Sequence, residues 1–336
     1  MHVVRKFAIK NILDKKDVLI STKTSSGKSL CYQALPVLTR SSVLVFSPLI
    51  SIMEDQVSFL NRLGLNSTSK GNDTKDNDRV KKGDFDVMFT SPETVLENEM
   101  WRDVLMCSQF RQRLCAIVVD EAHIVFQWDE GTKNSDPFRK WFCKTGEVRS
   151  LCPGHCQKKN KTGTARKRTR QAIEKILCMD LPVEIVEYPD RNNIKLNVKV
   201  EKSSLEVEVM FQWLLCALEE QQKKIIPTHK VFCKTIRDTC MEYVQMFHSC
   251  TPKAVKYLII EDMKSVDGMF RILICTNAAG MGVNFHGMNH VVNFGPPHEM
   301  DTFVQQIGRV GRSGEQAYHL LLTTIQQLRH TDQELR

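Results

Sequence analysis

Apolar residues in the first half of the chain gather in short continuous runs instead of alternating with polar ones. Strand-like runs occur at 18–20, 43–46, 86–89 and 116–119, and the segments 49–63 and 92–106 between them have helical spacing. Continuous apolar runs are typical of strands covered on both faces, as in a parallel sheet with helical crossovers. This half is therefore predicted to be an α/β domain.

The second half repeats the same alternation. A strand-like run at 183–186 precedes Tyr188–Asn193, which has the composition of a linker. We predict two tandem α/β domains, 1–188 and 196–336, joined by 189–195. Ligands of such sheets bind at the carboxyl ends of strands, so we expect the chemical motifs at those ends, in a cleft between the domains. The further elements are expected as strands near 194–200, 230–234, 271–276, 290–294 and 317–323 and helices near 205–222, 236–247, 253–264 and 301–309.

Composition narrows the class of protein. The chain is 42% hydrophobic and 26% charged, as in ordinary globular proteins, and its net charge of +8 favours a polyanionic partner. The twelve cysteines are scattered, and many lie within apolar runs, which fits free thiols in a reducing compartment. Only Cys152–Cys156 has ligand-like spacing, without a second pair at zinc-finger distance, so no zinc is expected. No signal peptide or apolar run long enough for a bilayer occurs, which predicts a soluble intracellular protein that has no membrane partner.

A candidate phosphate-binding loop lies between the run Val18–Ile20 and a helical segment. Backbone N–H groups and the positive end of a helix bind anions at such a turn, Lys28 can reach terminal phosphates, and Ser29 can ligand Mg²⁺. The first glycine of the usual pattern is replaced by Thr22, and an ordinary strand–helix turn is the alternative interpretation. The loop residues expected to contact the nucleotide are Thr24, Ser25, Ser26, Gly27, Lys28 and Ser29.

Two further motifs complete a site for phosphoryl transfer. Asp120 and Glu121 follow a predicted strand directly, so Asp120 can hold Mg²⁺ and Glu121 can orient or deprotonate a water. An acidic helix N-terminus is the alternative interpretation. In the second domain, Arg309 and Arg312 stand three residues apart and can stabilise the charge on a departing phosphoryl group. The alternative for this turn is a basic surface that faces nucleic acid.

Taken together in chain order, these motifs resemble the RecQ family of superfamily-two DNA helicases. The resemblance spans nearly the whole chain. It is carried by Gly27–Gln33, Ser47–Gln56, Thr90–Glu93, Asp120–His123, Thr276–Val283 and Gln305–Arg312.

The resemblance implies two RecA-like domains that hydrolyse ATP with Mg²⁺ and move along single-stranded DNA. It further implies that the protein unwinds tailed duplexes or junctions with 3′-to-5′ polarity and is therefore an isomerase. A role in DNA repair and recombination, and a nuclear location if the organism is eukaryotic, belong to the same implication. His123 would couple the two domains, and Gln305 would join Arg309 and Arg312 in catalysis. The family's aromatic-rich loop is matched by Trp128, Phe138 and Arg139, for which a core cluster is the alternative. DNA contacts are expected at Ser47, Pro48, Thr90, Trp128, Phe138, Arg139 and Thr276.

The chain also departs from the family pattern. Arg5 stands where the family has an adenine-reading glutamine, and less chain than in relatives lies between Tyr243 and His248. The residues before Thr162 are too polar for a buried central strand, so we expect the third-motif strand to be absent or the sheet rearranged. The basic run 158–170 is also compatible with a nuclear-import signal, a nucleic-acid patch or a solvated loop. A DNA-binding module without turnover and an RNA helicase are therefore the alternative functions.

Overall fold

The computed structural model divides the chain into two compact units, Met1–Pro189 and Asp190–Arg336, and each is described by itself. Strand β8 begins at Ile194, so the segment 189–195 includes the first two residues of a strand. The described residues are 2–23, 26–48, 50–70, 83–123, 145, 148, 157–162, 165–188, 190–202, 207–220, 228–232, 244–248, 250–265, 268–276, 288–297, 300–312 and 314–329.

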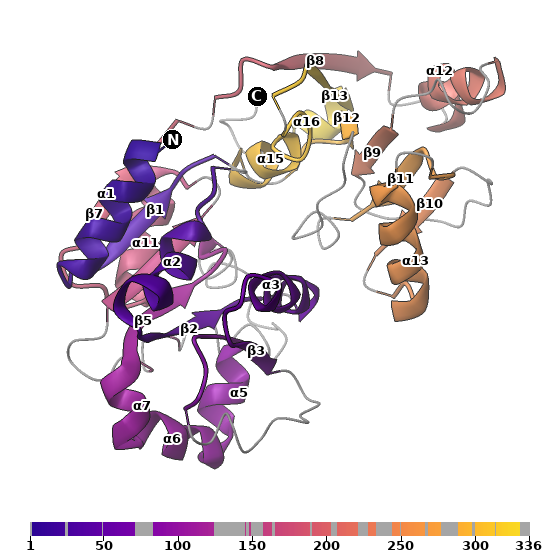
Figure 1. The fold of residues 1–336 in the computed structure, drawn as a ribbon. Helices are drawn as coiled ribbons and strands as arrows, with labels where there is room; N and C mark the ends of the chain where they lie inside the picture. The colour runs from indigo at the N-terminus through magenta and orange to yellow at the C-terminus, as the bar shows by residue number, and fades with distance from the viewer. Residues whose placement is uncertain are drawn as a thin grey trace. The chain divides into compact units, whose positions relative to one another are not determined.

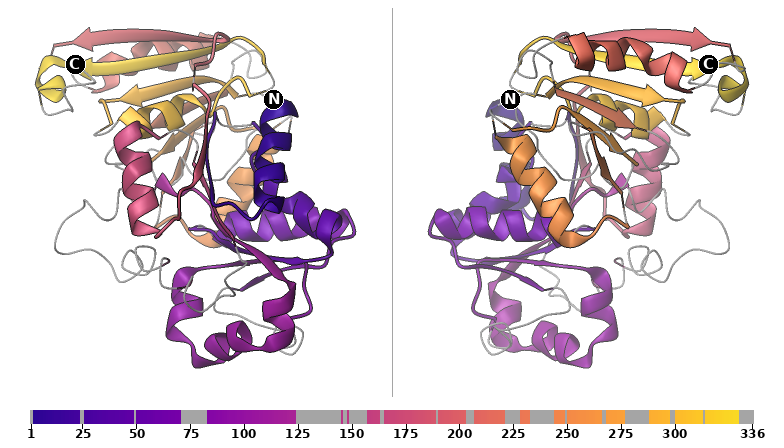
Figure 2. Two further views of the ribbon diagram at one scale, coloured as in Figure 1. Left: turned by 90° about the vertical axis from the view of Figure 1, so that its left-hand side faces the viewer. Right: turned by 90° about the vertical axis from the view of Figure 1, so that its right-hand side faces the viewer.

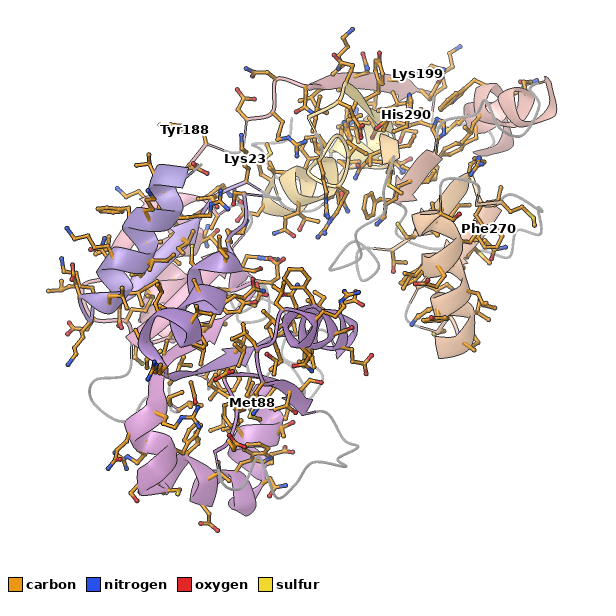
Figure 3. The ribbon with its side chains drawn as sticks, viewed as in Figure 1. Lys23, Met88, Tyr188, Lys199, Phe270 and His290 are labelled. Carbon is orange, nitrogen blue, oxygen red and sulfur yellow. The ribbon has the colours of Figure 1, made fainter. Side chains whose placement is uncertain are left out.

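Unit 1 is built on a seven-stranded sheet in the order β3-β4-β2-β5-β6-β1-β7, and every pairing is parallel (Figure 1). The strands β1, β2 and β4 are buried along their whole length, as their apolar runs predict. Met88 of β4, labelled in Figure 3, is fully buried. The strands are β1 (Val18–Ser21), β2 (Ser42–Phe46), β3 (Ser67–Lys70), β4 (Val87–Thr90), β5 (Leu114–Val119), β6 (Gln157–Thr162) and β7 (Val183–Val186).

Helices cover both faces of this sheet, as the views of Figure 2 show. One core layer joins alternate strand residues to Ala8, Tyr32 and Met53 of α1, α2 and α3. The opposite layer joins the other strand residues to Trp101 and Ile173 of α6 and α11. The helices are α1 (His2–Leu13), α2 (Leu30–Thr39), α3 (Ile50–Arg62), α5 (Pro92–Glu97), α6 (Glu99–Met106), α7 (Ser108–Arg113) and α11 (Lys167–Ile176).

The polar segment before Thr162 forms a strand in the middle of this sheet, so the expectation of a missing strand was wrong. Strand β6 pairs in parallel with β5 on one side and with β1 on the other. Its backbone thus supplies the hydrogen bonds that two central strands need, whatever the polarity of its side chains. Backbone pairing between two apolar neighbours has outweighed the low strand propensity of Gln-Lys-Lys-Asn-Lys-Thr.

Unit 2 has a six-stranded parallel sheet in the order β10-β11-β9-β12-β13-β8 (Figure 1). Helix α12 packs on one face through Met210 and Leu214, and α13 and α15 pack on the other through Ile259 and Ile307. The elements are β8 (Ile194–Glu201), α12 (Val207–Glu220), β9 (Thr228–Phe232), β10 (Val244–Phe247), α13 (Lys253–Lys264), β11 (Ile272–Cys275), β12 (Met288–Phe294), α15 (Met300–Ile307), β13 (Ala317–Thr324) and α16 (Ile325–Leu328).

Two predicted helices differ in the structure. The helix expected at 236–247 is wrong at its end, because Val244–Phe247 forms β10 and pairs with β11; residues 236–243 lie outside the described part. The helix expected at 92–106 is divided at Asn98, whose extended backbone (φ −101°, ψ 116°) separates α5 from α6. The rest of the predicted α/β alternation is confirmed in both units. Among the described residues, the helices are too short or too polar to span a membrane.

Candidate functional site

The loop between β1 and α2 has the backbone shape that the sequence predicts for phosphate binding. Gly27 has φ +74°, in the left-handed region that favours glycine, and Ser29 precedes the first residue of α2. Lys28 Nζ donates to the carbonyl oxygens of Thr22 at 2.8 Å and of Lys23 at 3.0 Å. The hydroxyls of Thr22 and Ser26 are hydrogen-bonded at 2.7 Å. Thr24 and Ser25 lie outside the described residues.

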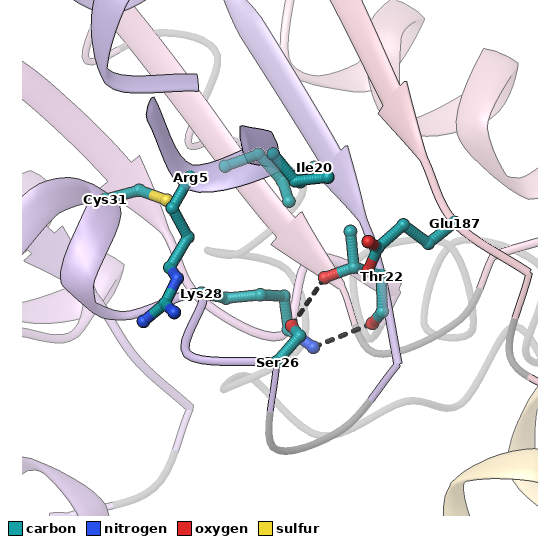
Figure 4. Close-up of a pocket in the computed structure, with 8 residues that line it drawn as sticks. Arg5, Ile20, Thr22, Ser26, Lys28, Cys31 and Glu187 are labelled. Carbon is teal, nitrogen blue, oxygen red and sulfur yellow. Dashed lines mark hydrogen bonds between the residues drawn. The ribbon is translucent and has the colours of Figure 1, made fainter. Parts of the chain in front are cut away.

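A small pocket opens beside this loop (Figure 4). Its volume of about 10 Å³ holds roughly one water molecule. A Cβ atom at Gly27 would stand 3.0 Å from Nη1 of Arg5, which places the guanidinium against the loop. The residues that line the pocket are Val4, Arg5, Ile20, Thr22, Ser26, Lys28, Cys31 and Glu187. Glu187 was missed in the sequence because it lies far from the motif; its backbone N–H donates to Ser21, which brings the end of β7 to the loop.

The acidic motif lies at the carboxyl end of β5. Asp120 is 6% exposed, and its Oδ1 accepts a 2.8 Å hydrogen bond from the backbone N–H of Glu121. Glu121 has φ +50°, which is uncommon for a residue other than glycine and turns the chain sharply after the strand. Nδ1 of the buried His123 lies 3.4 Å from Oε2 of Glu121. The three side chains are therefore grouped as the motif predicts.

Other predicted residues share this edge of the sheet. Ser47 follows β2 and donates its backbone N–H to Thr90, the last residue of β4, at 3.1 Å. Pro48 is the next residue, and both Ser47 and Thr90 are buried. Asp120 donates its backbone N–H to Phe46 of β2 at 2.8 Å, which joins the acidic motif to the same edge. The carboxyl ends of these strands thus bring Ser47, Thr90 and the acidic motif to one edge, as expected for a parallel sheet.

In unit 2, the predicted Arg309 and Arg312 lie in the turn that follows α15, residues 308–312, which we call the arginine turn. Gly308 extends α15, and Gly311 has φ +56° and donates its N–H to Met288, the first residue of β12, at 3.4 Å. The Gly311 carbonyl accepts hydrogen bonds from the side chains of Arg191 and Asn193. Asn193 directly precedes β8, so the turn lies at the amino ends of strands. The expectation that all motifs fall at carboxyl ends is wrong here, because α15 runs back along the sheet before the turn.

A buried chain of hydrogen bonds supports the end of α15. His319 Nε2 lies 3.0 Å from Oδ1 of Asn293, and Nδ2 of Asn293 donates to Oε1 of Gln306, next to Gln305, which is also buried. Burial lowers the pKa of His319 to about 4, so the ring is neutral at pH 7. Nε2 then carries the proton that it donates to the amide oxygen. No sequence motif indicates these hydrogen bonds; the available signal was the polar residues within the apolar strands β12 and β13.

Lys230 of β9 is a second polar residue that motif analysis missed. It is completely buried, and its Nζ lies 5.1 Å from the centre of the Phe232 ring. Burial lowers its pKa to about 8, and the positive charges of Arg309 and Arg312 act in the same direction. Lys230 therefore belongs to the electrostatic surroundings of the arginine turn.

Only some of the remaining predicted residues belong to the described part of the chain. Trp128, Phe138 and Arg139 lie outside the described residues, as does the cysteine cluster 152–156. Thr276 is described and directly follows β11, at its carboxyl end. Within the described ranges, His, Cys, Asp and Glu side chains form no group of three or more suited to a metal ion.

The groups in unit 1 fit a magnesium-bound nucleoside triphosphate. Mg²⁺ prefers oxygen ligands and is usually held by one or two carboxylates together with substrate phosphates. Asp120 offers a buried carboxylate at a strand end, and Ser29 offers a hydroxyl at the start of α2. Gly27 allows the backbone to approach a phosphate, and Lys28 adds positive charge. These are the donor types that the ligand requires.

Comparison with known proteins agrees with the motifs. Residues 4–141 match the DEAD/DEAH box helicase domain, and residues 210–314 match the helicase conserved C-terminal domain. The chain is 30% identical to the ATP-dependent DNA helicase Q-like 5 of Arabidopsis thaliana over 97% of its own length and 36% of the relative. It is 27% identical to the probable ATP-dependent DNA helicase RecS of Bacillus subtilis over 94% of its length and 62% of the relative. The chain thus spans about one to two thirds of these relatives.

Solved structures share the fold. Dbp5 of S. cerevisiae bound to RNA and ADP-BeF3 has a TM-score of 0.69 at 17% identity, covering 94% of this chain and 81% of that one. The helicase MrfA bound to DNA has a TM-score of 0.71 at 15% identity, covering 96% of this chain and 48% of that one. Both units therefore have the RecA-like fold, with parallel sheets and flanking helices. The chain therefore contains the two conserved helicase domains, and its sequence is similar to those of RecQ-type ATP-dependent DNA helicases.

Proposed function

We propose that the protein is an ATP-dependent DNA helicase that moves 3′ to 5′ along single-stranded DNA and unwinds duplexes. The observation that carries the proposal is the grouping in unit 1. Lys28 and Gly27 form an anion-binding loop after β1, and Asp120, Glu121 and His123 stand at the end of β5 on the same parallel sheet. The names of the DNA helicase relatives support DNA as the partner.

Each residue has a distinct role in this proposal. Lys28 and the loop N–H groups, including those of Thr24, Ser25 and Ser26, bind the phosphates of ATP. Ser29 and Asp120 hold Mg²⁺, which neutralises phosphate charge. Glu121 orients the attacking water and accepts its proton, and His123 fixes the Glu121 carboxylate through the 3.4 Å contact.

The arginine turn supplies positive charge. Arg309 and Arg312 stabilise the transferring phosphoryl group, and Gln305 at the end of α15 helps to position them. The anchoring of this turn by Arg191 and Asn193 supports the proposal, because a fixed charge costs less reorganisation during the reaction.

DNA is proposed to contact the carboxyl edge of the unit 1 sheet at Ser47, Pro48 and Thr90, and unit 2 at Thr276. Backbone and hydroxyl groups of this kind bind phosphates without reading sequence. Trp128, Phe138 and Arg139 are proposed to stack on bases and to pair with phosphates. A role in repair and recombination and an intracellular location, nuclear in a eukaryote, belong to the same proposal.

The test is ATP hydrolysis by the full chain with and without single-stranded DNA. Wild type should be stimulated by DNA, and Lys28→Ala and Glu121→Gln should each lower kcat by about 10²-fold or more. Duplexes with a 3′ or a 5′ tail then test polarity, since only the 3′-tailed substrate should be unwound. Equal, DNA-independent hydrolysis by all three proteins would refute the proposal.

A DNA-binding module without turnover is the second candidate. Two observations favour it: Lys28 donates to carbonyls of its own loop, and the Arg5 guanidinium lies against Gly27. This candidate predicts salt-sensitive DNA binding without hydrolysis. An RNA helicase is separated from both by competition between single-stranded RNA and DNA, in which RNA should compete poorly if the main proposal is right.

A further inference from the structure

Strand β8 forms one edge of the unit 2 sheet. It pairs in parallel with β13 along its whole length, and none of the described strands pairs with its other side (Figure 1). An edge strand presents backbone N–H and C=O groups that can pair with another chain, and natural edges are usually short or interrupted by proline or a bulge. Strand β8 runs from Ile194 to Glu201 without a proline or a register shift. Its outer side is therefore suited to pairing with a further strand.

Three apolar side chains project from one face of β8. Leu196 is 60%, Val198 64% and Val200 48% exposed. Leu196 lies beside His319 of β13, whose ring contacts Phe303, so the three side chains belong to the sheet face on which α15 packs. Single exposed apolar residues are normal on a protein surface, but a row of them on an open edge strand marks a surface for association.

The opposite face of β8 has a charge pattern. Lys195, Asn197 and Lys199 project from this face, and Glu201 ends the row. The Nζ atom of Lys199 lies 2.6 Å from Oε1 of Glu201. The row is therefore basic in its first part and acidic at its end, so a copy of the strand that runs in the reverse direction can place opposite charges against each other.

A twofold axis between two antiparallel β8 strands sets residues of the same face opposite one another, because such an axis is perpendicular to the sheet. The axis must then pass through a residue. With the axis at Val198, Lys195 lies opposite Glu201 of the second copy, and Leu196 lies opposite Val200. This register therefore matches opposite charges on one face and apolar side chains on the other.

The neighbouring registers match less well. With the axis at Asn197, Lys195 would lie opposite Lys199, and with the axis at Lys199 the two copies of that lysine would face each other. Like charges directly opposite in a sheet are destabilising. An axis at Leu196 would pair only residues 194–198 of the strand. The register at Val198 thus combines a long overlap with favourable pairs.

We propose that two copies of this chain associate through β8, antiparallel and with the twofold axis at Val198, so that their unit 2 sheets become one continuous sheet. The dimer joins the apolar rows of both copies and pairs Lys195 of each copy with Glu201 of the other. This inference goes beyond the proposed function, because β8 holds none of the residues assigned to nucleotide, magnesium or DNA.

The experiment is sedimentation velocity of the full chain without DNA, at about 1 to 100 µM. A single pair of edge strands is a small interface, so wild type should form a reversible dimer in this range. Val198→Lys sets two ammonium groups opposite each other at the axis and should weaken dimerisation about tenfold or more. Leu258→Lys makes the same kind of change at a residue of α13 that is 63% exposed, and it should leave dimerisation unchanged.

A charge exchange tests the register. Lys195→Glu and Glu201→Lys should each weaken the dimer about tenfold, because the pair occurs twice in each dimer. The double variant restores opposite charges between the copies and should dimerise within about threefold of wild type. Circular dichroism checks that every variant is folded.

Three outcomes would overturn the inference. A wild type that stays monomeric throughout the concentration range would leave the edge of β8 to an extended segment of a different protein. A dimer that Val198→Lys leaves intact would be formed through another surface. A double charge variant as weak as the two single variants would show that Lys195 and Glu201 do not face each other.

Discussion

Gly27 in the phosphate loop and Gly311 in the arginine turn both adopt positive φ, at +74° and +56°, but they have different neighbours. The three described atoms nearest to a Cβ atom at Gly27 would all belong to the side chain of Arg5, at 3.0 to 3.6 Å. One at Gly311 would stand 2.5 Å from Nδ2 of Asn193, 2.9 Å from Cβ of Ala317 and 3.0 Å from the Glu315 carbonyl oxygen. Gly27 thus borders a flexible side chain, whereas Gly311 is packed against Asn193, Ala317 and Glu315.

The difference indicates how each unit fixes its functional groups. In unit 1, the acidic motif and the loop take their places from the ends of neighbouring strands, so local sequence decides most of the geometry. In unit 2, long-range hydrogen bonds from Arg191 and Asn193 fix the turn. We therefore expect the loop to change shape around a ligand at lower cost than the turn. Each prediction below tests this contrast.

The largest effect is expected for Gly311→Ala. The new methyl group must displace packed atoms, and the residue must keep a left-handed backbone, which together should destabilise unit 2 by about 4 kcal/mol. Amide hydrogen exchange in β12 and β13 of the full chain measures this loss. Gly314→Ala is the control: Gly314 has φ +95° and open space around it, so it should cost only about 1 kcal/mol. Similar exchange in the two variants would contradict the tight packing of the turn.

The buried hydrogen bonds that link His319, Asn293 and Gln306 should make the stability of unit 2 sensitive to acid. The folded pKa is about 4, and the unfolded value is about 6.5. Between these values the unfolded chain binds a proton that the folded chain does not, so stability falls as the pH drops through this window, by at most about 3 kcal/mol. Burial lowers the pKa of His290 as well, which acts in the same direction.

His319→Gln is the matched variant for that measurement. A glutamine amide can donate to Oδ1 of Asn293 but does not titrate, so the hydrogen bond is kept and the pH dependence is reduced. Hydrogen exchange of β13 at pH 7 and pH 5 compares the two proteins. If both lose the same stability on acidification, His319 is not the source.

The elements that were predicted correctly from the sequence are those whose secondary structure depends on their own residues. The apolar runs of β2 and β4 required cover on both faces, and the structure provides it. Strand β6 and residues 244–247 were mispredicted because their strand structure comes from pairing with neighbours: β6 lies between β5 and β1, and Val244–Phe247 pairs with β11. Single-chain periodicity contains no information about such partners.

The same distinction applies to the candidate site. The grouping of Asp120, Glu121 and His123 followed from their positions within four consecutive residues after one strand, and the structure brings them together. The position of the arginine turn did not follow, because it depends on Asn193 and Met288, which are distant in sequence. The roles assigned to all these residues stay predictions.

A smaller effect, of opposite sign, is expected for Lys230→Met. Lys230 is charged at pH 7 in both states, so its burial cost is present there; methionine has a similar shape without charge and should stabilise unit 2 by about 2 kcal/mol. The folded pKa is about 8, and the unfolded value is about 10.5. In this window the unfolded chain binds more protons, so wild-type stability should rise with pH, and the variant should lack this rise.

Lys202→Met is the control for Lys230, because Lys202 lies exposed directly after the edge strand β8, on which Figure 3 labels Lys199. It should change stability by less than about 0.5 kcal/mol. Hydrogen exchange of β9 and β12 at pH 7 measures the stability of unit 2 in both variants. A destabilised Lys230→Met would mean that the buried ammonium makes interactions worth more than its desolvation, and unit 2 would then depend on buried charge.

The smallest effect is expected for Gly27→Ala. The described atoms nearest to the methyl group belong to the movable end of Arg5, so the cost should be the strain of a left-handed alanine, about 1 kcal/mol, measured by hydrogen exchange of β1 and α2. Arg5→Ala in the same chain removes the described side chain nearest to the new Cβ. Because the flexible end of Arg5 can move away from the methyl group, the double variant should depart from the sum of the single changes by only about 0.5 kcal/mol, the low end for residues in contact. A cost for Gly27→Ala as large as that of Gly311→Ala, or a strong rescue by Arg5→Ala, would show that the phosphate loop is as tightly packed as the arginine turn, and the contrast between the two units would fail.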